Sequence, residues 1–169
     1  DQAVKEFSST HCNGKFPVIA ADAQIETRAT RRGAGVLVLC GPAERDEANR
    51  IVAAANHPNV TTLASLPLSL GLTKAVIERL DLLVTTDSGP RHFATALGVP
   101  TVTLFGPTHP GTWHPLAGPH RALVADGLDC LHCNANACPL PGDRWMRCMR
   151  DVGAARVADA ARALLREGR

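Results

Sequence analysis

The chain has 169 residues, of which 45% are hydrophobic and 20% are charged, and its formal net charge is +2. This length and composition predict one globular domain with a full core. The small net charge gives no reason to expect nucleic acid as a partner. No apolar run approaches the ~20 residues of a membrane span. Aromatic residues make up only 4% and include no Tyr, which disfavours a surface that stacks bases or sugar rings.

The first 13 residues show little periodicity, but small hydroxyl residues there are followed by a Gly and a Lys. A loop that contains Thr10, Gly14 and Lys15 could hold a phosphate. Spacing alone favours the simpler interpretation, a solvated N-terminal segment. Residues 17–32 are predicted to form a helix, because two arginines occupy the last turn and Gly33 follows.

Strand and helix patterns alternate after Gly33. Residues 36–40 are an apolar run typical of a buried strand. A helix with acidic residues in its first turn is predicted at 44–55, followed by a strand at 60–63. A further helix is predicted from about residue 67 to 80.

The rest of the chain is organised around residues 82–108. A short apolar strand begins this stretch, and residues 87–90 (D-S-G-P) stop it and start a helix that Asp87 or Ser88 can cap. Another apolar strand follows the helix. Two strand ends and one helix N-terminus are therefore expected to converge, and anionic ligands bind at such points in open α/β sheets. Gly89 has no Cβ, so a ligand can lie close to the backbone there.

The last third of the chain is less regular. It contains a loop rich in Pro and Gly at 109–115, a short strand at 122–124 and a Cys-bearing loop within 126–150. Asp151 is predicted to cap a final helix. The alternation as a whole predicts an α/β fold, with a Rossmann-like parallel sheet and helices on both faces, in a single domain over residues 1–169.

Three common motifs are absent from the sequence: G-x-G-x-x-G after the first clear strand, G-x-x-x-x-G-K-[ST], and G-x-S-x-G. The chain therefore lacks the fingerprints of ordinary dinucleotide binding, of a P-loop NTPase and of an α/β-hydrolase. Asp87, Ser88 and His92 have the residue types of a hydrolytic triad. Because Asp87 and Ser88 are adjacent in the chain, a relay through His92 is awkward, and a hydrolase is disfavoured.

His92 and Asp87 each have two interpretations. His92 lies about one turn into its helix, so its side chain leans back toward the exposed N–H groups and could donate to a phosphate oxygen. It could equally bond a local carbonyl. Asp87 is either a simple helix cap or an acceptor for sugar hydroxyls, because a carboxylate would repel a diphosphate. The residues alone leave both questions open.

Four of the six cysteines form the pattern C-x2-C-x4-C-x9-C, namely Cys130, Cys133, Cys138 and Cys148. This spacing is compatible with a tetrahedral zinc site, with His132 as a spare ligand. The alternatives are reduced thiols, or one or two disulfides. A chain of this size does not need disulfides, so we favour reduced thiols and a cytosolic setting.

Residues 87–108, D-S-G-P-x-H-x-A-x-A-L-G-V-P-x-V-x-L-F-G-P-T, resemble the signature of glycosyltransferase family 9, the ADP-heptose:lipopolysaccharide heptosyltransferases. The resemblance continues through Trp113 and Pro115 to the cysteine loop C-x2-C-x4-C-P-L and to C-M-R-D at 148–151. Upstream, G-P-A-E-R at 41–45 resembles a segment of the family's C-terminal domain.

The resemblance implies a GT-B fold, in which two Rossmann-like domains face each other across a cleft and the C-terminal domain holds the nucleotide sugar. This chain resembles that C-terminal domain alone, and its first residue is Asp rather than Met, so we expect a processed or truncated chain. By their place in the motif, Ser88, Gly89 and His92 would contact the donor diphosphate. Asp87 would contact the sugar.

Further donor contacts are implied outside this motif. Lys15 and Thr10 match residues that contact phosphate in the family, although the segment reads Lys-Phe-Pro where Lys-x-Trp-Pro is expected. Asp46, with Glu44 as the competing choice, would hold the adenosine ribose, and Asp is shorter than the Glu expected there. Leu68 would line the adenine pocket. Either departure implies weaker nucleotide binding or a different donor.

The implied reaction is an inverting, metal-independent transfer of heptose from ADP-heptose to the lipopolysaccharide core. In the family, the catalytic base and the acceptor site belong to the N-terminal domain, so we expect no catalytic residue in this chain and no turnover by it. The implied location is the cytoplasm, with contact at the inner face of the inner membrane left open. Two alternatives remain: a zinc- or thiol-stapled structural or interaction module, and another nucleotide-sugar enzyme such as an epimerase.

Overall fold

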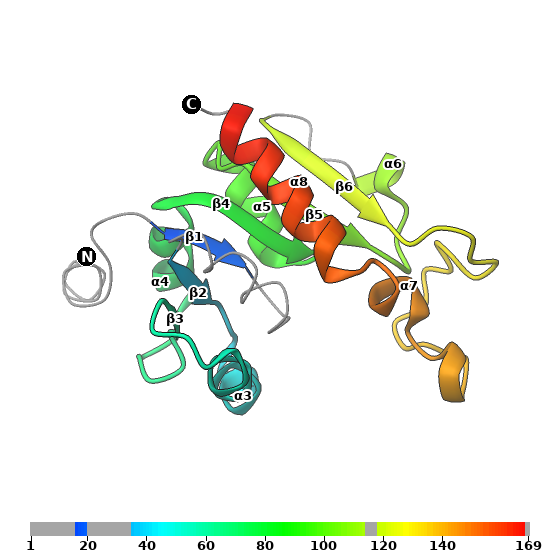
Figure 1. Ribbon diagram of the computed structural model, residues 1–169, viewed down its shortest axis with the longest axis horizontal. Helices are drawn as coiled ribbons and strands as arrows, with labels where there is room; N and C mark the ends of the chain where they lie inside the picture. Colours follow the sequence, from blue (N-terminus) through cyan, green and yellow to red (C-terminus); the bar gives the residue numbers. More distant parts are fainter. Residues whose placement is uncertain (1–15, 20–34, 114–117, 168–169) are drawn as a thin grey trace.

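The computed structural model describes residues 16–19, 35–113 and 118–167 (Figure 1). Thr10 and Lys15, for which phosphate contacts are predicted, lie outside these residues. Strand β1 is Phe16–Ile19, so the helix predicted from residue 17 is wrong for these residues, and the rest of it lies outside the described part. Residues 16–19 form a strand that pairs in parallel with β4. The register shifts between Phe16 and Pro17, which accommodates a proline that cannot donate to the ladder.

The alternation of strand and helix predicted from residue 36 onward is confirmed. The strands after β1 are β2 (Val36–Val38), β3 (Val60–Thr62), β4 (Leu80–Thr86), β5 (Thr101–Phe105) and β6 (His120–Val124). The longer helices are α3 (Arg45–Ala55), α4 (Leu70–Ile77), α5 (Gly89–Ala96) and α8 (Ala154–Glu167). Short helical turns are η1 (Pro42–Glu44), α6 (Pro110–Trp113), η2 (Gly142–Arg144) and α7 (Arg147–Arg150).

The described strands form parallel ladders in the order β1-β4-β5-β6 and β2-β3. Because β1 and β2 also lie in contact, the strands follow the order β3-β2-β1-β4-β5-β6. This is the order of a doubly wound, Rossmann-like sheet, and it reverses between β1 and β4. Ligands bind such sheets outside the carboxyl ends of the strands near the reversal. The predicted fold class is therefore confirmed.

Helices cover both faces of the sheet, and Figure 1 shows α8 in front of the strands and α5 behind them. Alternate residues of a strand point to opposite faces, so each strand supplies both cores. On one face, Val36, Val38 and Val84 pack with residues of α3 and α8. On the other, Leu37 and Leu83 pack with residues of α4 and α5.

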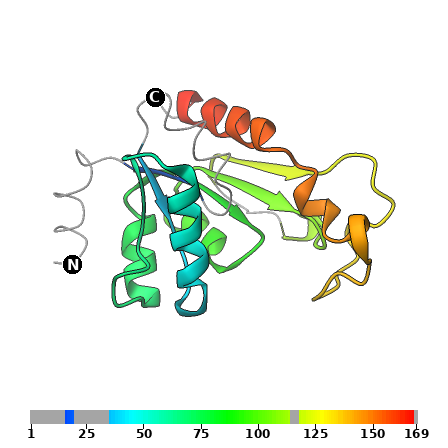
Figure 2. The same cartoon turned by 60° about the horizontal axis from the view of Figure 1, so that its bottom comes forward.

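Three details of the C-terminal third differ from the sequence expectations. Residues Pro110–Trp113 form α6 despite their Pro and Gly content, and the Cys-bearing segment contains η2 and α7. Asp151 does not cap the final helix; it ends α7 and pairs with Arg147 at 2.7 Å. Figure 2 shows that the segment between β6 and α8 extends beyond the end of the sheet. These short turns are fixed by packing rather than by a periodic pattern.

Candidate functional site

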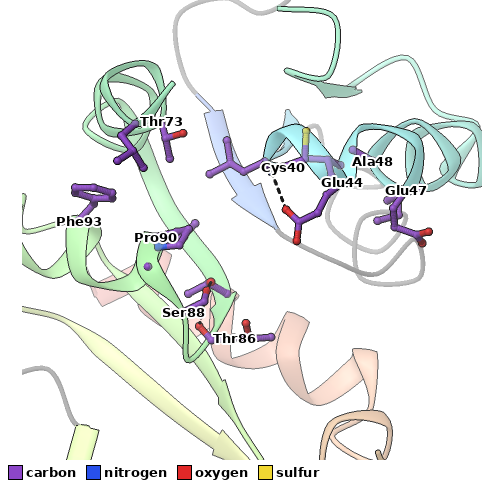
Figure 3. Close-up of a pocket in the computed structure, with 17 residues that line it drawn as sticks. Cys40, Glu44, Glu47, Ala48, Thr73, Thr86, Ser88, Pro90 and Phe93 are labelled. Atoms are coloured by element: carbon purple, nitrogen blue, oxygen red, sulfur yellow. Dashed lines mark hydrogen bonds between the residues drawn. The ribbon is translucent and has the colours of Figure 1, made fainter. Parts of the chain in front are cut away.

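A cavity of about 430 Å³ lies at the carboxyl ends of β2 and β4 (Figure 3). One side of the cavity is formed by the turn after β2 and by helix α3. The other side is formed by the start of α5 and by two residues of α4, Leu70 and Thr73. Its lining residues are Val38, Leu39, Cys40, Gly41, Glu44, Glu47, Ala48, Ile51, Leu70, Thr73, Leu83, Thr85, Thr86, Ser88, Gly89, Pro90 and Phe93. The cavity therefore occupies the position that the strand order predicts for a ligand.

The start of α5 presents a helix N-terminus to the cavity. Ser88 is the N-cap residue, and its side chain makes no capping hydrogen bond. Its Oγ lies 3.2 Å from Oγ1 of the buried Thr85. Among the residues that the structure describes, none outside the adjoining backbone comes within 4 Å of a Cβ placed on Gly89, so these residues leave the space beside this backbone open. A helix N-terminus with open backbone and a hydroxyl beside it suits a phosphate or diphosphate.

The turn after β2 supplies the carboxylates of the cavity. Oε2 of Glu44 accepts a hydrogen bond of 2.7 Å from the backbone N–H of Gly41, which fixes the turn. Figure 3 shows this bond and the Glu44 side chain beside the cavity. Glu47 also lines the cavity, whereas Asp46 is exposed and does not. Carboxylate oxygens in this position can accept hydrogen bonds from sugar hydroxyls.

Apolar side chains line the part of the cavity formed by α4 and α5. Leu70, at the start of α4, is 75% exposed, which is unusual for a leucine and leaves its side chain available to a ligand. Phe93 of α5 faces the same space. Leu68 does not line the cavity; it is half-buried and packs against the core beneath α4. An aromatic base would find apolar contact at Leu70 and Phe93.

Asp87 and His92 lie next to the cavity but do not line it. Oδ1 of Asp87 forms an ion pair of 2.7 Å with Nη2 of Arg91, whose side chain is 1% exposed. His92 is exposed, and its Nε2 lies 3.4 Å from Nη2 of the same arginine. Ser88 rather than Asp87 occupies the N-cap position. Both predicted residues are thus connected through Arg91.

The Cys-bearing segment docks on the turn after β5. The backbone N–H groups of His132 and Asn134 donate to the carbonyl oxygens of Gly106 and Pro107, at 3.0 and 2.7 Å. Gly106 is packed so closely that an added Cβ would lie 2.9 Å from Sγ of Cys148. The glycine therefore allows α7 to approach the end of β5.

The cysteines of this segment are free thiols. Burial raises the pKa of the Cys148 thiol, and the negative charges of Cys130, Cys133 and Cys138 raise it further. The backbone N–H of Met146, 3.4 Å from Sγ of Cys138, lowers the pKa of that thiol. Within residues 16–19, 35–113 and 118–167, no three Cys, His, Asp or Glu side chains are grouped so that they could hold a metal ion. The predicted zinc alternative therefore gains no support from the geometry.

Sequence reasoning missed three residues of this region. Thr85 is a buried hydroxyl at the end of β4, and the T-T-D-S order around it could have indicated a second hydroxyl beside Ser88. Arg91 follows Asp87 by four residues, the spacing of a helical ion pair. Leu70 is two residues from Leu68, and only the position of the α4 N-terminus decides which of the two lines the cavity.

Comparison with known proteins identifies the family. The family model for glycosyltransferase family 9 (heptosyltransferase) matches residues 23–142. The chain belongs to glycosyltransferase family 9. The match includes the cavity and most of the Cys-bearing segment, so the site described above lies within the shared part of this family.

Curated family 9 relatives are heptosyltransferases. Lipooligosaccharide heptosyltransferase 2 of Campylobacter jejuni serotype O:2 is 31% identical over 134 residues, which cover 75% of this chain and 39% of that protein. Lipopolysaccharide heptosyltransferase 1 of Pseudomonas aeruginosa is 32% identical over 154 residues, which cover 84% of this chain and 42% of that protein. The chain thus spans about two fifths of the length of these relatives.

Solved family 9 structures share the fold. The glycosyl transferase family 9 protein from Veillonella parvula has a TM-score of 0.76 at 22% identity, covering 98% of this chain and 51% of that one. E. coli ADP-heptose lps heptosyltransferase II has a TM-score of 0.74 at 21% identity, and the match covers 99% of this chain and 53% of that one. An E. coli heptosyltransferase solved with ADP-2-deoxy-2-fluoro heptose has a TM-score of 0.60 at 18% identity, covering 98% and 47%.

Proposed function

We propose that this chain is the donor-binding domain of an inverting heptosyltransferase that transfers heptose from ADP-heptose to the lipopolysaccharide core. The observation that carries the proposal is the cavity at the carboxyl ends of β2 and β4, where a helix N-terminus, carboxylates and an apolar wall meet. Membership of glycosyltransferase family 9 and the names of the curated relatives support the same reaction. The extent of the structural matches supports a place in one half of a two-domain enzyme.

We place the ADP moiety along the cavity by its chemistry. The diphosphate lies at Ser88 and Gly89, where the N-terminus of α5 favours negative charge. The ribose lies by Glu44, a choice over Asp46 that its position beside the cavity supports. The adenine lies against Leu70, which replaces Leu68 in the predicted set. In this arrangement the diphosphate and the base lie on the side of the cavity formed by α5 and α4, and the ribose faces the turn after β2 on the other side.

The remaining predicted donor residues complete this arrangement. We propose that His92 donates to the diphosphate and that Asp87 orients the sugar. Thr10 and Lys15 lie outside the described residues, and we keep them as predicted phosphate contacts. Lys15 would contribute a positive charge to the binding of the phosphates.

The proposed reaction breaks one bond and forms one at the anomeric carbon of the donor. An acceptor hydroxyl attacks that carbon, its proton passes to a carboxylate base, and the bond to the diphosphate oxygen breaks. ADP leaves with the electron pair of that bond. This chain stabilises the charge that develops on the diphosphate, through the α5 N-terminus and the donors beside it. We expect the base to be supplied by a part of the enzyme outside this chain.

The acceptor is attached to a membrane lipid, so we propose a cytoplasmic enzyme that contacts the membrane surface peripherally. Of the helices in the described ranges, none has the length and apolar character required to cross a bilayer. The proposal of contact rests on the nature of the acceptor.

The experiment that tests this function separates binding from transfer. The 169-residue chain is titrated calorimetrically with ADP-heptose, and it is then incubated with ADP-heptose and a lipid A–core acceptor. We expect binding without transferred heptose. Transfer by the chain alone would contradict the placement of the base elsewhere, and absence of binding would contradict the donor site itself.

A further inference from the structure

A buried arginine belongs to the same helical turn as the residues of the proposed diphosphate site. Arg91 belongs to the first turn of α5, and its side chain is only 1% exposed. Its Nη2 is 2.7 Å from Oδ1 of Asp87, and its guanidinium carbon is 5.7 Å from the ring centroid of the buried Phe105. The guanidinium is thus held between the end of β5 and the loop that leads into α5.

The ion pair between Arg91 and Asp87 offsets a negative charge that would otherwise lie beside the proposed diphosphate site. Asp87 directly precedes Ser88 and Gly89, which line the cavity at the helix N-terminus. An uncompensated carboxylate there would compete with an incoming diphosphate for the same positive potential and would repel it. The guanidinium cancels this charge at a distance of 2.7 Å, in surroundings where screening by water is weak. The loop therefore keeps a carboxylate without presenting net negative charge to the ligand.

The same guanidinium also orients His92. Nη2 of Arg91 lies 3.4 Å from Nε2 of His92, and a guanidinium has only donors. Nε2 of the imidazole must therefore accept, which in the neutral ring leaves the proton on Nδ1. His92 then has an N–H available for an acceptor such as a phosphate oxygen.

We propose that Arg91 is a positioning residue for diphosphate binding: it neutralises Asp87 and orients His92, and so lets the N-terminus of α5 accept a nucleoside diphosphate. The inference rests on the proposed donor-binding function and adds to it the residue that makes the acidic motif compatible with an anionic ligand. Arg91 has this role without lining the cavity itself.

The test compares ADP and adenosine binding by calorimetry in the chain and in three variants. ADP carries the diphosphate but no sugar, so it reports the electrostatic role and not the sugar contact of Asp87. Arg91→Met leaves an unpaired carboxylate and is expected to weaken ADP binding about tenfold or more. Asp87→Asn leaves the positive charge of Arg91 uncompensated and is expected to tighten ADP binding about two- to tenfold. The double variant is expected to bind ADP within about threefold of the unchanged chain.

The controls separate this role from a general structural one. Adenosine lacks phosphate, so its binding should change little in any variant. Arg121→Met, on β6, removes an exposed arginine paired with Glu167 and should leave ADP binding unchanged. Circular dichroism checks the fold of each variant, and if Arg91→Met does not fold, Asp87→Asn and the double variant still decide the sign of the effect.

Two results would overturn the inference. One is weaker ADP binding in Asp87→Asn, because this would show that the carboxylate supports the ligand site instead of opposing it. The other is an equal loss of ADP and adenosine binding in Arg91→Met. If the unchanged chain binds no ADP, the proposed function itself fails, and the inference fails with it; ADP binding that is the same in all variants contradicts the inference alone.

Discussion

At the scale of single residues, the candidate site depends on Ser88 and Gly89, which leave backbone N–H groups uncapped and accessible at the start of α5. Ser88 stands at the N-cap of α5 without capping it, and Gly89 leaves space beside the backbone where any other residue would place a Cβ. Helices are usually capped by the side chain in this position, which satisfies one of the exposed N–H groups. Here a ligand anion can take that role.

Gly89→Ala tests whether a diphosphate packs against the backbone at the start of α5, because it adds only one methyl group there. Outside the adjoining backbone, no atom of the described part of the chain lies within 4 Å of the added Cβ, so the fold should tolerate it. The higher helix propensity of Ala should leave stability equal or raise it by about 0.5–1 kcal/mol. A diphosphate packed against the backbone would collide with the methyl group. We therefore expect ADP affinity to fall about tenfold by calorimetry, at unchanged or higher thermal stability. Unchanged affinity would place the ligand elsewhere.

The sequence allowed prediction of some site residues better than others. Ser88 and Gly89 line the cavity as expected, because they belong to one strand–turn–helix motif in which local chemistry decides the position. Of Asp46 and its competing choice Glu44, only Glu44 lines the cavity, and Leu70 lines it where Leu68 is predicted. A shift of one or two residues at a helix start decides which side chain faces the cavity, and such boundaries are the least predictable feature of a helix.

At the scale of elements, α4 and α7 each depend on one small residue: a serine that caps α4 and a glycine that lets α7 pack closely. Ser69 caps α4, because its Oγ accepts a hydrogen bond of 3.1 Å from the backbone N–H of Leu72. Gly106 instead makes room for α7 against the end of β5. One residue supplies an acceptor, and the other supplies space.

Ser69→Ala is expected to lower the free energy of unfolding by about 1 kcal/mol, through loss of the α4 cap. Urea unfolding of the chain measures this change. Ser65→Ala provides the matched control, because Ser65 is exposed and outside any helix, and its substitution should cost less than about 0.5 kcal/mol. Equal effects of the two substitutions would argue against the cap.

Gly106→Ala is expected to destabilise the chain by about 1–3 kcal/mol, because the new Cβ would overpack the junction. It would lie 2.7 Å from Sδ of Met149 and 2.9 Å from Sγ of Cys148. The measurement is thermal or urea unfolding, together with the rate at which iodoacetamide labels Cys148, which should rise as α7 loosens. A stable variant with a protected Cys148 thiol would mean that α7 can shift without cost.

The elements themselves were predictable where hydrophobic periodicity was long enough. The strands from residue 36 onward and helices α3, α4, α5 and α8 follow from apolar runs, turn residues and caps. Strand β1 differs from the helix predicted from residue 17, because the four residues Phe-Pro-Val-Ile are too few to show a period. The turns α6 and α7 have four residues each and depend on tertiary packing, which no local pattern encodes.

At the scale of the whole molecule, the strand order explains why the cavity lies where it does. The parallel sheet reverses its winding between β1 and β4, and the loops after β2 and β4 separate at its carboxyl edge to leave a crevice. The chain spans about two fifths of the length of its curated relatives. A domain that presents a helix N-terminus and an apolar wall to one cavity is consistent with the proposed donor half of a split active site.

Hydrogen–deuterium exchange with and without ADP-heptose shows whether this donor binds at the crevice. If it does, exchange should slow at residues 86–93, around the α5 N-terminus, and at residues 41–48, around the turn after β2. The Cys-bearing segment at 126–150 should exchange at an unchanged rate. Protection confined to 126–150, or no protection anywhere at saturating ligand, would contradict binding at the crevice.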